Sequence, residues 1–335
     1  MNADESNIQV LFFQQIKAQL PAHLSMVDEI AEILSISNDS AYRRIRGEKP
    51  ITFDELRLLC SHFKLSVDQF LHLKNDSIIF NGRLVDNATF NFEEYLKGIL
   101  AQLQFFNSFN KKELVYLCKD MPMFHHCLFP ELGAFKFFFW IKSVLQYPEF
   151  AKVPFNIKTL SDTVLELTRK IGEEYTMLPS LEIWNIETIH ATIRQIDYYK
   201  NTGSFSSSSD LERVLNCLEQ AVDHIDQEAE LGYKFFPGDV RKIPKASYKI
   251  YVNEFILGDN TIFLTLDEKR LTYINHSAIN IMFTRDPVFN EYMHHYILNM
   301  IKKSTLISEV GEKERTKFFN NIREKISSRK HALLQ

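Results

Sequence analysis

Glycine is scarce in this chain and phenylalanine is abundant. Of the 335 residues, 10 are Gly and 28 are Phe, so Gly makes up about 3% of the chain against a usual share of about 7%. Barrels, propellers and nucleotide-binding loops need Gly wherever the backbone turns sharply or approaches a ligand closely. The composition therefore argues against those architectures and favours a helix-rich protein with an aromatic core.

The length and the charge narrow the class of protein further. A chain of 335 residues predicts two or three domains, and 45% hydrophobic with 24% charged residues is an ordinary globular composition. The net charge is −4, so the whole molecule has no field that would attract nucleic acid or an anionic membrane. Any contact with DNA must come from a local patch.

The sequence carries no membrane or secretion signal. Its longest unbroken apolar runs, such as Phe137–Ile141, are five residues long, whereas a membrane span needs roughly 20. The first ten residues, MNADESNIQV, are acidic and polar, unlike a signal peptide. Four cysteines without a CxxC pair suit a reducing compartment. We expect a cytoplasmic protein that does not bind membranes.

The first 75 residues predict five short helices in a domain of their own. Apolar residues recur there at helical spacing, and Thr52-Phe-Asp-Glu55 forms a capping box that opens the fourth helix. Ser35-Ile-Ser-Asn38 separates the second helix from the third, which ends at Gly47. The other expected helices are residues 8–20, 27–34, 39–46 and 67–73.

This region resembles the repressor-and-Cro (XRE-like) helix-turn-helix family of transcription regulators, over about residues 8–73. The resemblance lies in Val27-Asp-Glu-Ile-Ala31, Leu34-Ser-Ile-Ser37, Tyr42-Arg-Arg-Ile-Arg-Gly47 and Leu65-Ser-Val-Asp-Gln-Phe70. It implies an all-α, five-helix helix-turn-helix domain that binds double-stranded DNA. The chain departs from the family at three positions, with Ser35 where Gly is frequent, Val27 where Gln is frequent, and Arg44 where an apolar residue is usual.

The third helix, Asp39–Arg46, is the predicted DNA-reading element. At about 100° per residue, an inward-facing Ala41 and Ile45 leave Arg43 pointing outward. An outward Arg can bind guanine edges, while Arg46 and Lys49 suit phosphate. The predicted DNA-binding residues are Asn38, Asp39, Ser40, Tyr42, Arg43, Arg44, Arg46 and Lys49.

The charge of this region limits how tightly it can bind DNA. Residues 1–75 hold 8 basic and 10 acidic residues, a net charge of −2, so non-specific affinity should be weak. Specific binding then requires a dimer on two half-sites, and a homodimer is expected. The same acidic balance favours an alternative, a protein-interaction scaffold whose helix-turn-helix does not bind DNA.

The remainder of the chain mixes helices and strands. Residues 76–110 predict a linker and a connecting helix, and 111–335 a larger, helix-rich α+β domain for dimerisation and effector sensing. Leu114–Cys118 predicts a buried strand. Three further strands predict an antiparallel meander near the C-terminus: Tyr248–Leu257, Thr261–Leu266 and Arg270–Asn275. Further helices are expected at 135–145, 161–175, 187–199, 211–231, 287–303 and 312–328.

This larger domain shows no catalytic motif. GxSxG, GxxxxGK[ST], GxGxxG and HExxH are all missing from the sequence. The region is faintly similar to degenerate phospholipase-D-like effector domains, but the catalytic HxKxxxxD motif is absent, since His62-Phe-Lys64 is followed by Gln69 where Asp is needed. We therefore expect no enzyme activity and no cofactor, with an enzyme site of unrecognised type in 111–335 as a further alternative.

Two pairs of histidines and one aromatic helix invite functional readings. His125-His126-Cys127 and His294-His295 have metal-binding side chains, but no second ligand pair lies at metal spacing, so structural or surface roles and no metal are expected. The dense aromatics of Phe135–Trp140 are more typical of a core than of a ligand pocket. Taken together, the sequence predicts a DNA-binding transcription regulator whose large domain responds to a small-molecule or protein effector.

Overall fold

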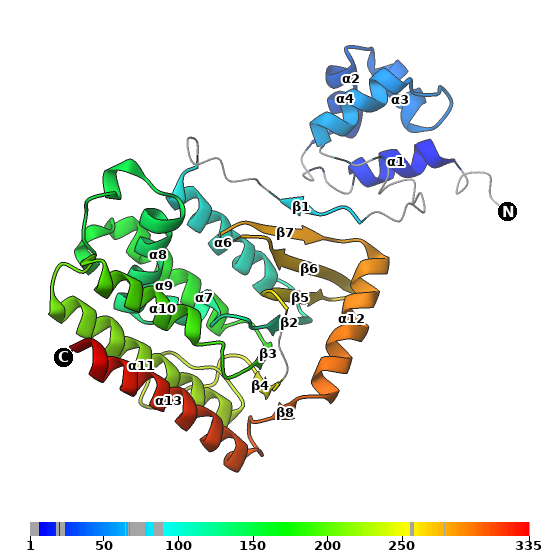
Figure 1. Ribbon diagram of the computed structural model, residues 1–335. Coiled ribbons are helices and arrows are strands. Elements are labelled where there is room, and N and C mark those ends of the chain that lie inside the picture. Colours follow the sequence, from blue (N-terminus) through cyan, green and yellow to red (C-terminus); the bar gives the residue numbers. More distant parts are fainter. Residues whose placement is uncertain are drawn as a thin grey trace. The chain divides into compact units, whose positions relative to one another are not determined.

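The computed structural model describes residues 7–17, 20, 24–63, 65, 67, 78–82, 90–254, 258–277 and 279–334. The chain divides into two compact units, Met1–Ile79 and Phe80–Gln335 (Figure 1). Each unit has its own hydrophobic core, and each is described by itself below.

The smaller unit is built from four described helices around one apolar core. Helix α2 is followed by a short turn and then by α3, and the core is formed mainly by Phe12, Phe13, Ile30, Ala41 and Leu59. The helices are α1 (Ile8–Lys17), α2 (Met26–Leu34), α3 (Asn38–Ile45) and α4 (Phe53–Phe63).

Side-chain caps fix where these helices begin. The Ser37 hydroxyl accepts a hydrogen bond from the backbone N–H of Ser40 at the start of α3, as N-cap serines do. Ser35 ends α2 in the left-handed conformation, with φ of 53°. The predicted capping box is confirmed, because Thr52 N–H donates to Glu55 and Glu55 N–H donates to the Thr52 hydroxyl, at 3.0 and 3.2 Å.

The expectation of a five-helix helix-turn-helix domain is wrong for the part of the chain that the structure describes. Four helices are seen there, and nearly all of the predicted helix at 67–73 lies outside the described residues. A seven-residue apolar pattern is weak evidence for a helix, because so short a helix depends on tertiary packing.

The larger unit contains one mixed sheet of eight described strands in the order β1-β7-β6-β5-β2-β3-β4-β8. Strands β2, β3 and β4 are parallel, and all the other pairings are antiparallel. The strands are β1 (Asn81–Gly82), β2 (Lys112–Leu117), β3 (Ser180–Trp184), β4 (Tyr248–Val252), β5 (Thr261–Leu266), β6 (Lys269–Asn275), β7 (Ile281–Thr284) and β8 (Thr305–Leu306).

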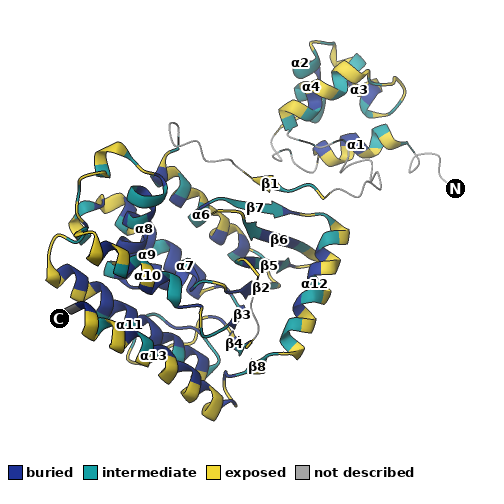
Figure 2. Cartoon of the chain, in the orientation of Figure 1, coloured by how far each residue is buried: buried dark blue, intermediate teal, exposed yellow. Residues whose placement is uncertain are grey.

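Helices cover both faces of this sheet. Along β2, Leu114 and Tyr116 pack into the large helical layer, whereas Val115 and Leu117 pack against α12 on the other face, as the two-residue period of a strand requires. Helices α11 and α13 are buried on their inner sides and exposed on their outer sides (Figure 2). The helices are α6 (Phe92–Asn107), α7 (Met123–Cys127), α8 (Pro130–Phe139), α9 (Asp162–Thr176), α10 (His190–Asn201), α11 (Ser208–Leu231), α12 (Pro287–Lys302) and α13 (Glu312–Leu334).

The predicted antiparallel meander is wrong. Strand β4, its expected first member, pairs in parallel with β3 and is separated from β5 by β2 and β3. Of the three predicted members, only β5 and β6 pair with each other, antiparallel, and the unpredicted β7 pairs antiparallel with β6. Period-two patterning identifies strands but not their partners, and β3, the strand between β2 and β4, is missing from the sequence prediction.

Several other expectations are met in the described residues. Strand β2 and the helices α9, α11, α12 and α13 occur where the sequence predicts them. Helix α6 lies in the range expected to hold a linker and a connecting helix, and it buries Phe92, Leu96, Leu103 and Phe106 in the core of the larger unit. In the described ranges, no helix is both long enough and apolar enough to cross a membrane.

Candidate functional site

The outer face of α3 carries four exposed side chains in one stripe. They are spaced at i, i+3, i+4 and i+7, and they are Asp39, Tyr42, Arg43 and Arg46. The opposite face of the helix carries Ala41, which is completely buried. The guanidinium of Arg46 lies 5.6 Å from the centre of the Tyr42 ring. The structure thus brings half of the predicted DNA-binding residues together on one surface.

Arg44 lies inside the small unit, where its guanidinium forms a paired contact with Glu55. Its Nη2 and Nε donate to the two carboxylate oxygens of Glu55 at 2.7 and 3.1 Å, and its Nη1 donates to the Ser40 hydroxyl and carbonyl at 2.7 and 3.1 Å. Only 5% of Arg44 is exposed. Contrary to the sequence prediction, Arg44 is therefore not available to DNA, because its side chain lies in the interior of the small unit.

The Arg44–Glu55 pair makes the small unit sensitive to acid. The hydrogen bond from Arg44 lowers the pKa of Glu55 against the opposing effect of burial, so the pair contributes stability above the ordinary pKa of 4.5 and loses it as the pH falls through the lowered value. Glu55→Gln should cost the small unit about 1–2 kcal/mol at neutral pH.

Hydrogen exchange of α3 and α4 in the full chain measures this effect. The difference in protection between wild type and Glu55→Gln should shrink as the pH falls below the ordinary Glu pKa. Glu32→Gln, exposed on α2, is the control and should show little difference at any pH. A difference for Glu55→Gln that stays constant with pH would contradict this role of the pair.

Glu48 lies beside the two outward arginines. Its carboxylate lies 3.2 Å from Nε of Arg46 and 4.0 Å from Nε of Arg43. All three side chains are about half exposed, so these ion pairs are weak and exchangeable. The remaining predicted residues lie nearby, since Asn38 donates to Asp28 at 2.7 Å and Lys49 is exposed.

Gln9 fixes the loop that follows α3, a role that the sequence analysis missed. Its side-chain amide donates to the carbonyls of Arg44 and Lys49 at 2.7 and 2.8 Å and accepts from the N–H of Ile51 at 2.9 Å. Gly47 in this loop has φ of 72°, and a Cβ there would lie 2.3 Å from Nδ2 of Asn7. Gln9 is one of four polar residues on α1, so the sequence alone did not single it out.

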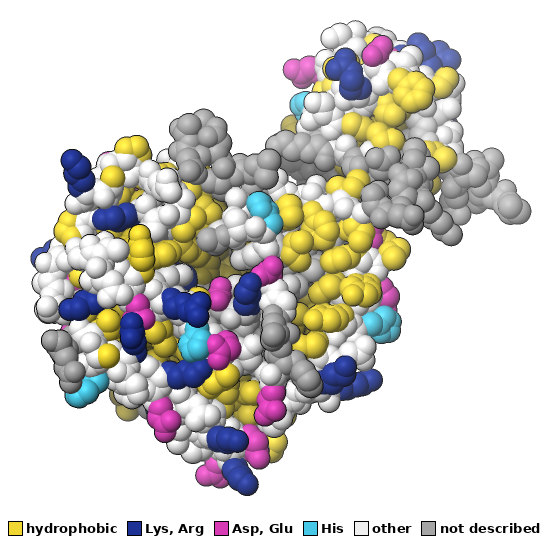
Figure 3. Space-filling view, viewed as in Figure 1, with side chains coloured by type: hydrophobic (Ala, Val, Ile, Leu, Met, Phe, Trp, Pro, Cys, Tyr) yellow, Lys and Arg dark blue, Asp and Glu magenta, His cyan; other side chains and the backbone are white. Residues whose placement is uncertain are grey.

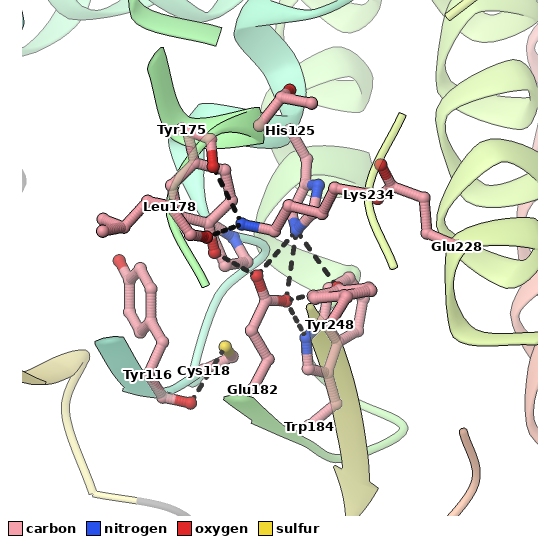
Figure 4. Close-up of polar contacts among 12 residues, drawn as sticks. Tyr116, Cys118, His125, Tyr175, Leu178, Glu182, Trp184, Glu228, Lys234 and Tyr248 are labelled. Atoms are coloured by element: carbon pink, nitrogen blue, oxygen red, sulfur yellow. Dashed lines mark hydrogen bonds and ion pairs between the residues drawn. The ribbon is translucent and has the colours of Figure 1, made fainter. Parts of the chain in front are cut away.

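A second polar cluster lies in the core of the larger unit, around Glu182 on β3. Leu181 and Ile183 face α12, so the intervening Glu182 points into the helical layer, where it is 0% exposed. Figure 4 shows the surrounding side chains converging on it. The donors to its carboxylate are Tyr248 OH at 2.9 Å, Trp184 Nε1 at 2.7 Å, His125 Nε2 at 2.9 Å, and Tyr175 OH.

These contacts keep Glu182 ionised. Burial alone would raise its pKa, but the charge and hydrogen bond of His125, the charge of Lys234 and the Tyr175 hydroxyl lower the pKa to about 2. A carboxylate that accepts several hydrogen bonds is stabilised in its charged form. The arrangement is therefore a buried anion held by surrounding donors.

Lys234 acts on this anion through its charge. Its Nζ donates to the carbonyls of Tyr175 and Leu178 at 2.9 and 3.0 Å and lies 3.4 Å from the centre of the Tyr175 ring. Burial lowers the pKa of Lys234 to about 7. Glu228, also buried, accepts from the N–H of Phe235 at 3.1 Å and lies 3.1 Å from His224.

The Glu182 cluster has the side chains of an acid–base site but the surroundings of a core. Glu182, His125 and Lys234 are each at most 1% exposed, so a substrate would have to displace the helical layer to reach them. Buried polar networks of this kind specify a single arrangement of the elements around them. We assign the cluster a structural role.

The histidines that the sequence analysis singled out contact different partners. His125 serves Glu182, whereas His126 contacts the Thr192 hydroxyl at 2.9 Å through Nε2. His294 stacks on Phe263. Across the described residues, no three His, Cys, Asp or Glu side chains are placed to bind a metal ion.

The visible surface of the larger unit has a hydrophobic part and a charged part (Figure 3). Hydrophobic side chains gather over α12 and the neighbouring strands, and the exposed ones on α12 include Val288, Tyr292 and Leu298. Charges of both signs are mixed over α10, α11 and α13. There, Arg323 donates to Asp223 and Asp226 at 2.7 and 2.6 Å, so this cation of α13 is paired within the unit.

Comparison with known proteins gives no match. No protein-family model, no curated protein and no solved structure matches this chain. The resemblances to the repressor-and-Cro family and to phospholipase-D-like domains therefore remain predictions, which rest on the residues quoted for them.

Proposed function

We propose that the protein is a sequence-specific DNA-binding transcription regulator and that α3 enters the major groove. The observation that supports this most is the exposed stripe of α3, in which Arg43 and Arg46 project from a helix that the Arg44–Glu55 pair anchors from inside. A base-reading helix needs a rigid attachment and a polar outer face.

The basic and aromatic residues of this surface each have a role that suits their chemistry. Arg43, at the centre of the stripe, donates to guanine O6 and N7 in the bidentate manner that its planar guanidinium provides. Arg46 and Lys49 lie toward the end of α3 and beyond it, and they bind phosphates, which sets the register of the helix. Tyr42, 49% exposed, contacts base methyl groups or sugar.

The larger unit supplies dimerisation and sensing in this proposal. Because residues 1–75 have a net charge of −2, one copy gains little non-specific affinity, and two copies on two half-sites are needed. Binding of an effector would change the spacing of the two α3 helices and so couple the signal to DNA affinity.

Selection from a random-sequence duplex DNA library with the purified full chain tests the proposal. The proposal expects enrichment of a motif with two-fold symmetry and half-sites about one helical turn apart. Selections are run at low salt, with and without cell extract to supply an effector. Failure to enrich any motif under both conditions would contradict DNA reading.

Glu48→Gln should strengthen DNA binding. Glu48 now lies beside Arg43 and Arg46, so removing its charge frees both cations for DNA and removes repulsion from phosphate. The expected gain is about 1 kcal/mol or less, with a steeper fall of affinity with salt. Gel shift at two salt concentrations measures it, with Glu113→Gln of the larger unit as the control, and weaker binding by Glu48→Gln would argue against this use of the arginines.

A protein-binding scaffold is the second candidate. The exposed side chain of Phe53, 92% accessible, and that of Leu58 on the same helix support it, because exposed large apolar side chains often mark protein contacts. Salt dependence separates the two candidates, since DNA affinity falls steeply with salt and an apolar contact does not.

A further inference from the structure

The chain continues from α8 directly into a wider helical turn that begins at Trp140. Residues Trp140–Val144 form a π-helix, in which the N–H of Leu145 donates to the carbonyl of Trp140 at 2.8 Å. The following Gln146 is left-handed, with φ of 54°. Wide turns of this kind are frequent at functional sites, and a positive φ outside glycine is strained unless its surroundings hold it.

A cavity opens at this irregular segment. It has a volume of about 350 Å³ and lies between the π-helix, the turn after it and the C-terminal end of α10. That volume falls within the range of small-molecule pockets. The polar side chains that line it include Lys142, Ser143, Tyr199, Thr202 and Ser204. None of the lining residues is Asp or Glu, so the only charge in the lining is positive.

The polar groups of the cavity are arranged in pairs. The Ser143 hydroxyl lies 3.0 Å from the Tyr199 hydroxyl, and the Thr202 hydroxyl lies 2.8 Å from that of Ser204. Lys142 Nζ donates one hydrogen bond, to the carbonyl of Val153 at 2.6 Å, which leaves two of its three protons for other acceptors. The cavity thus offers one cation and two hydroxyl pairs.

The aromatic core holds this arrangement in place. Tyr199 is completely buried, and its ring packs against Phe135, Phe138 and Phe139 at centroid distances of 5.3–6.1 Å. Burial raises the pKa of Tyr199 to about 12, so its hydroxyl keeps its proton and can donate. Tyr198, 55% exposed, adds an aromatic wall to the cavity.

We propose that this cavity binds a small anionic polyol, such as a sugar phosphate or a sugar acid. Lys142 binds the oxyanion, the paired hydroxyls of Ser143 and Ser204 exchange hydrogen bonds with the hydroxyl groups of the ligand, and the Tyr198 ring covers its apolar face. The proposal rests on the sensing role proposed for the larger unit, and it names the class of effector.

Binding to the full chain is measured without DNA, so that failure here is distinct from failure of DNA recognition. The probes are glucose 6-phosphate, gluconate, glucose and inorganic phosphate, and the readouts are calorimetry and the fluorescence of Trp140. Glucose 6-phosphate or gluconate should bind more tightly than glucose and phosphate. Glucose 6-phosphate and gluconate separate the phosphate from the carboxylate form of the ligand.

Variants locate the binding in this cavity. Lys142→Gln should weaken binding of the anionic probe about tenfold or more, as loss of a charge-assisted hydrogen bond does. Lys200→Gln should not weaken it, because Lys200 is exposed on α10, next to the cavity but outside its lining. Tyr199→Phe keeps the ring and should also weaken binding. No binding of either anionic probe at millimolar concentration, equal binding of glucose or of phosphate alone, or unchanged binding by both variants would overturn the proposal.

Discussion

Replacing Glu182 by Ala is expected to destabilise the larger unit by about 3–5 kcal/mol, the range for removal of one partner from a buried charged network. The substitution leaves the Tyr175, Tyr248 and Trp184 donors without their acceptor, and it removes the carboxylate that His125 contacts. The cost exceeds that of the lost hydrogen bonds, because each stranded polar group stays buried.

Urea unfolding followed by tryptophan fluorescence measures this loss, since Trp184 reports directly on the cluster. Glu182→Gln keeps an acceptor but not the charge, so it should fall between Ala and wild type. Glu113→Ala, exposed on the adjacent strand β2, is the matched control and should change stability by about 0.5 kcal/mol or less. A Glu182→Ala protein within about 1 kcal/mol of wild type would show that the cluster does not stabilise the fold.

Replacing Phe319 by Ala should have a cost of similar size, about 3–5 kcal/mol. Phe319 is completely buried on the inner side of α13 and packs edge-on against Phe318 at 5.3 Å. Truncation there removes buried apolar surface and leaves a cavity between α13 and the layer below it. The outer ion pairs of α13, such as Arg329 with Asp197 at 2.7 Å, are partly exposed and offset little of this loss.

Phe105→Ala is the matched control, because Phe105 on α6 is 55% exposed. Chemical unfolding of both variants should show a loss for Phe319→Ala at least three times that for Phe105→Ala. Equal losses would mean that α13 is an appendage of the larger unit and that the core is complete without it.

Local sequence patterns predicted the positions of helices and strands more reliably than the pairing of the strands. Caps and helical spacing identified α9, α11 and the start of α4, because those signals lie within a few residues of each other. The pairing of β4 with β3 depends on the crossover through α11 and on which faces the helices cover, and no short window contains that information. The five-residue strand β3 also carries Glu182, an acidic residue that disfavours a prediction of buried strand.

The same limit applies to the two clusters of polar residues. The outward position of Arg43 follows from the helical period of α3 alone. Arg44 was also expected on the DNA-binding surface, because its partner Glu55 lies 11 residues further along and only the fold brings them together. The cluster around Glu182 joins residues from α7, α9, β3 and β4. Because these elements are far apart in the sequence, no local pattern predicts the cluster.

The affinity of wild type and Arg43→Ala for the DNA site recovered by selection is the most direct test of the proposed function. Fluorescence anisotropy at two salt concentrations gives both affinities, with Arg169→Ala, an equally exposed arginine of the larger unit paired with Glu173, as the control. We expect Arg43→Ala to lose about 1–3 kcal/mol, roughly 5- to 150-fold, on the recovered site and far less on unrelated DNA. Equal affinities of wild type and Arg43→Ala for that site would contradict DNA reading by α3.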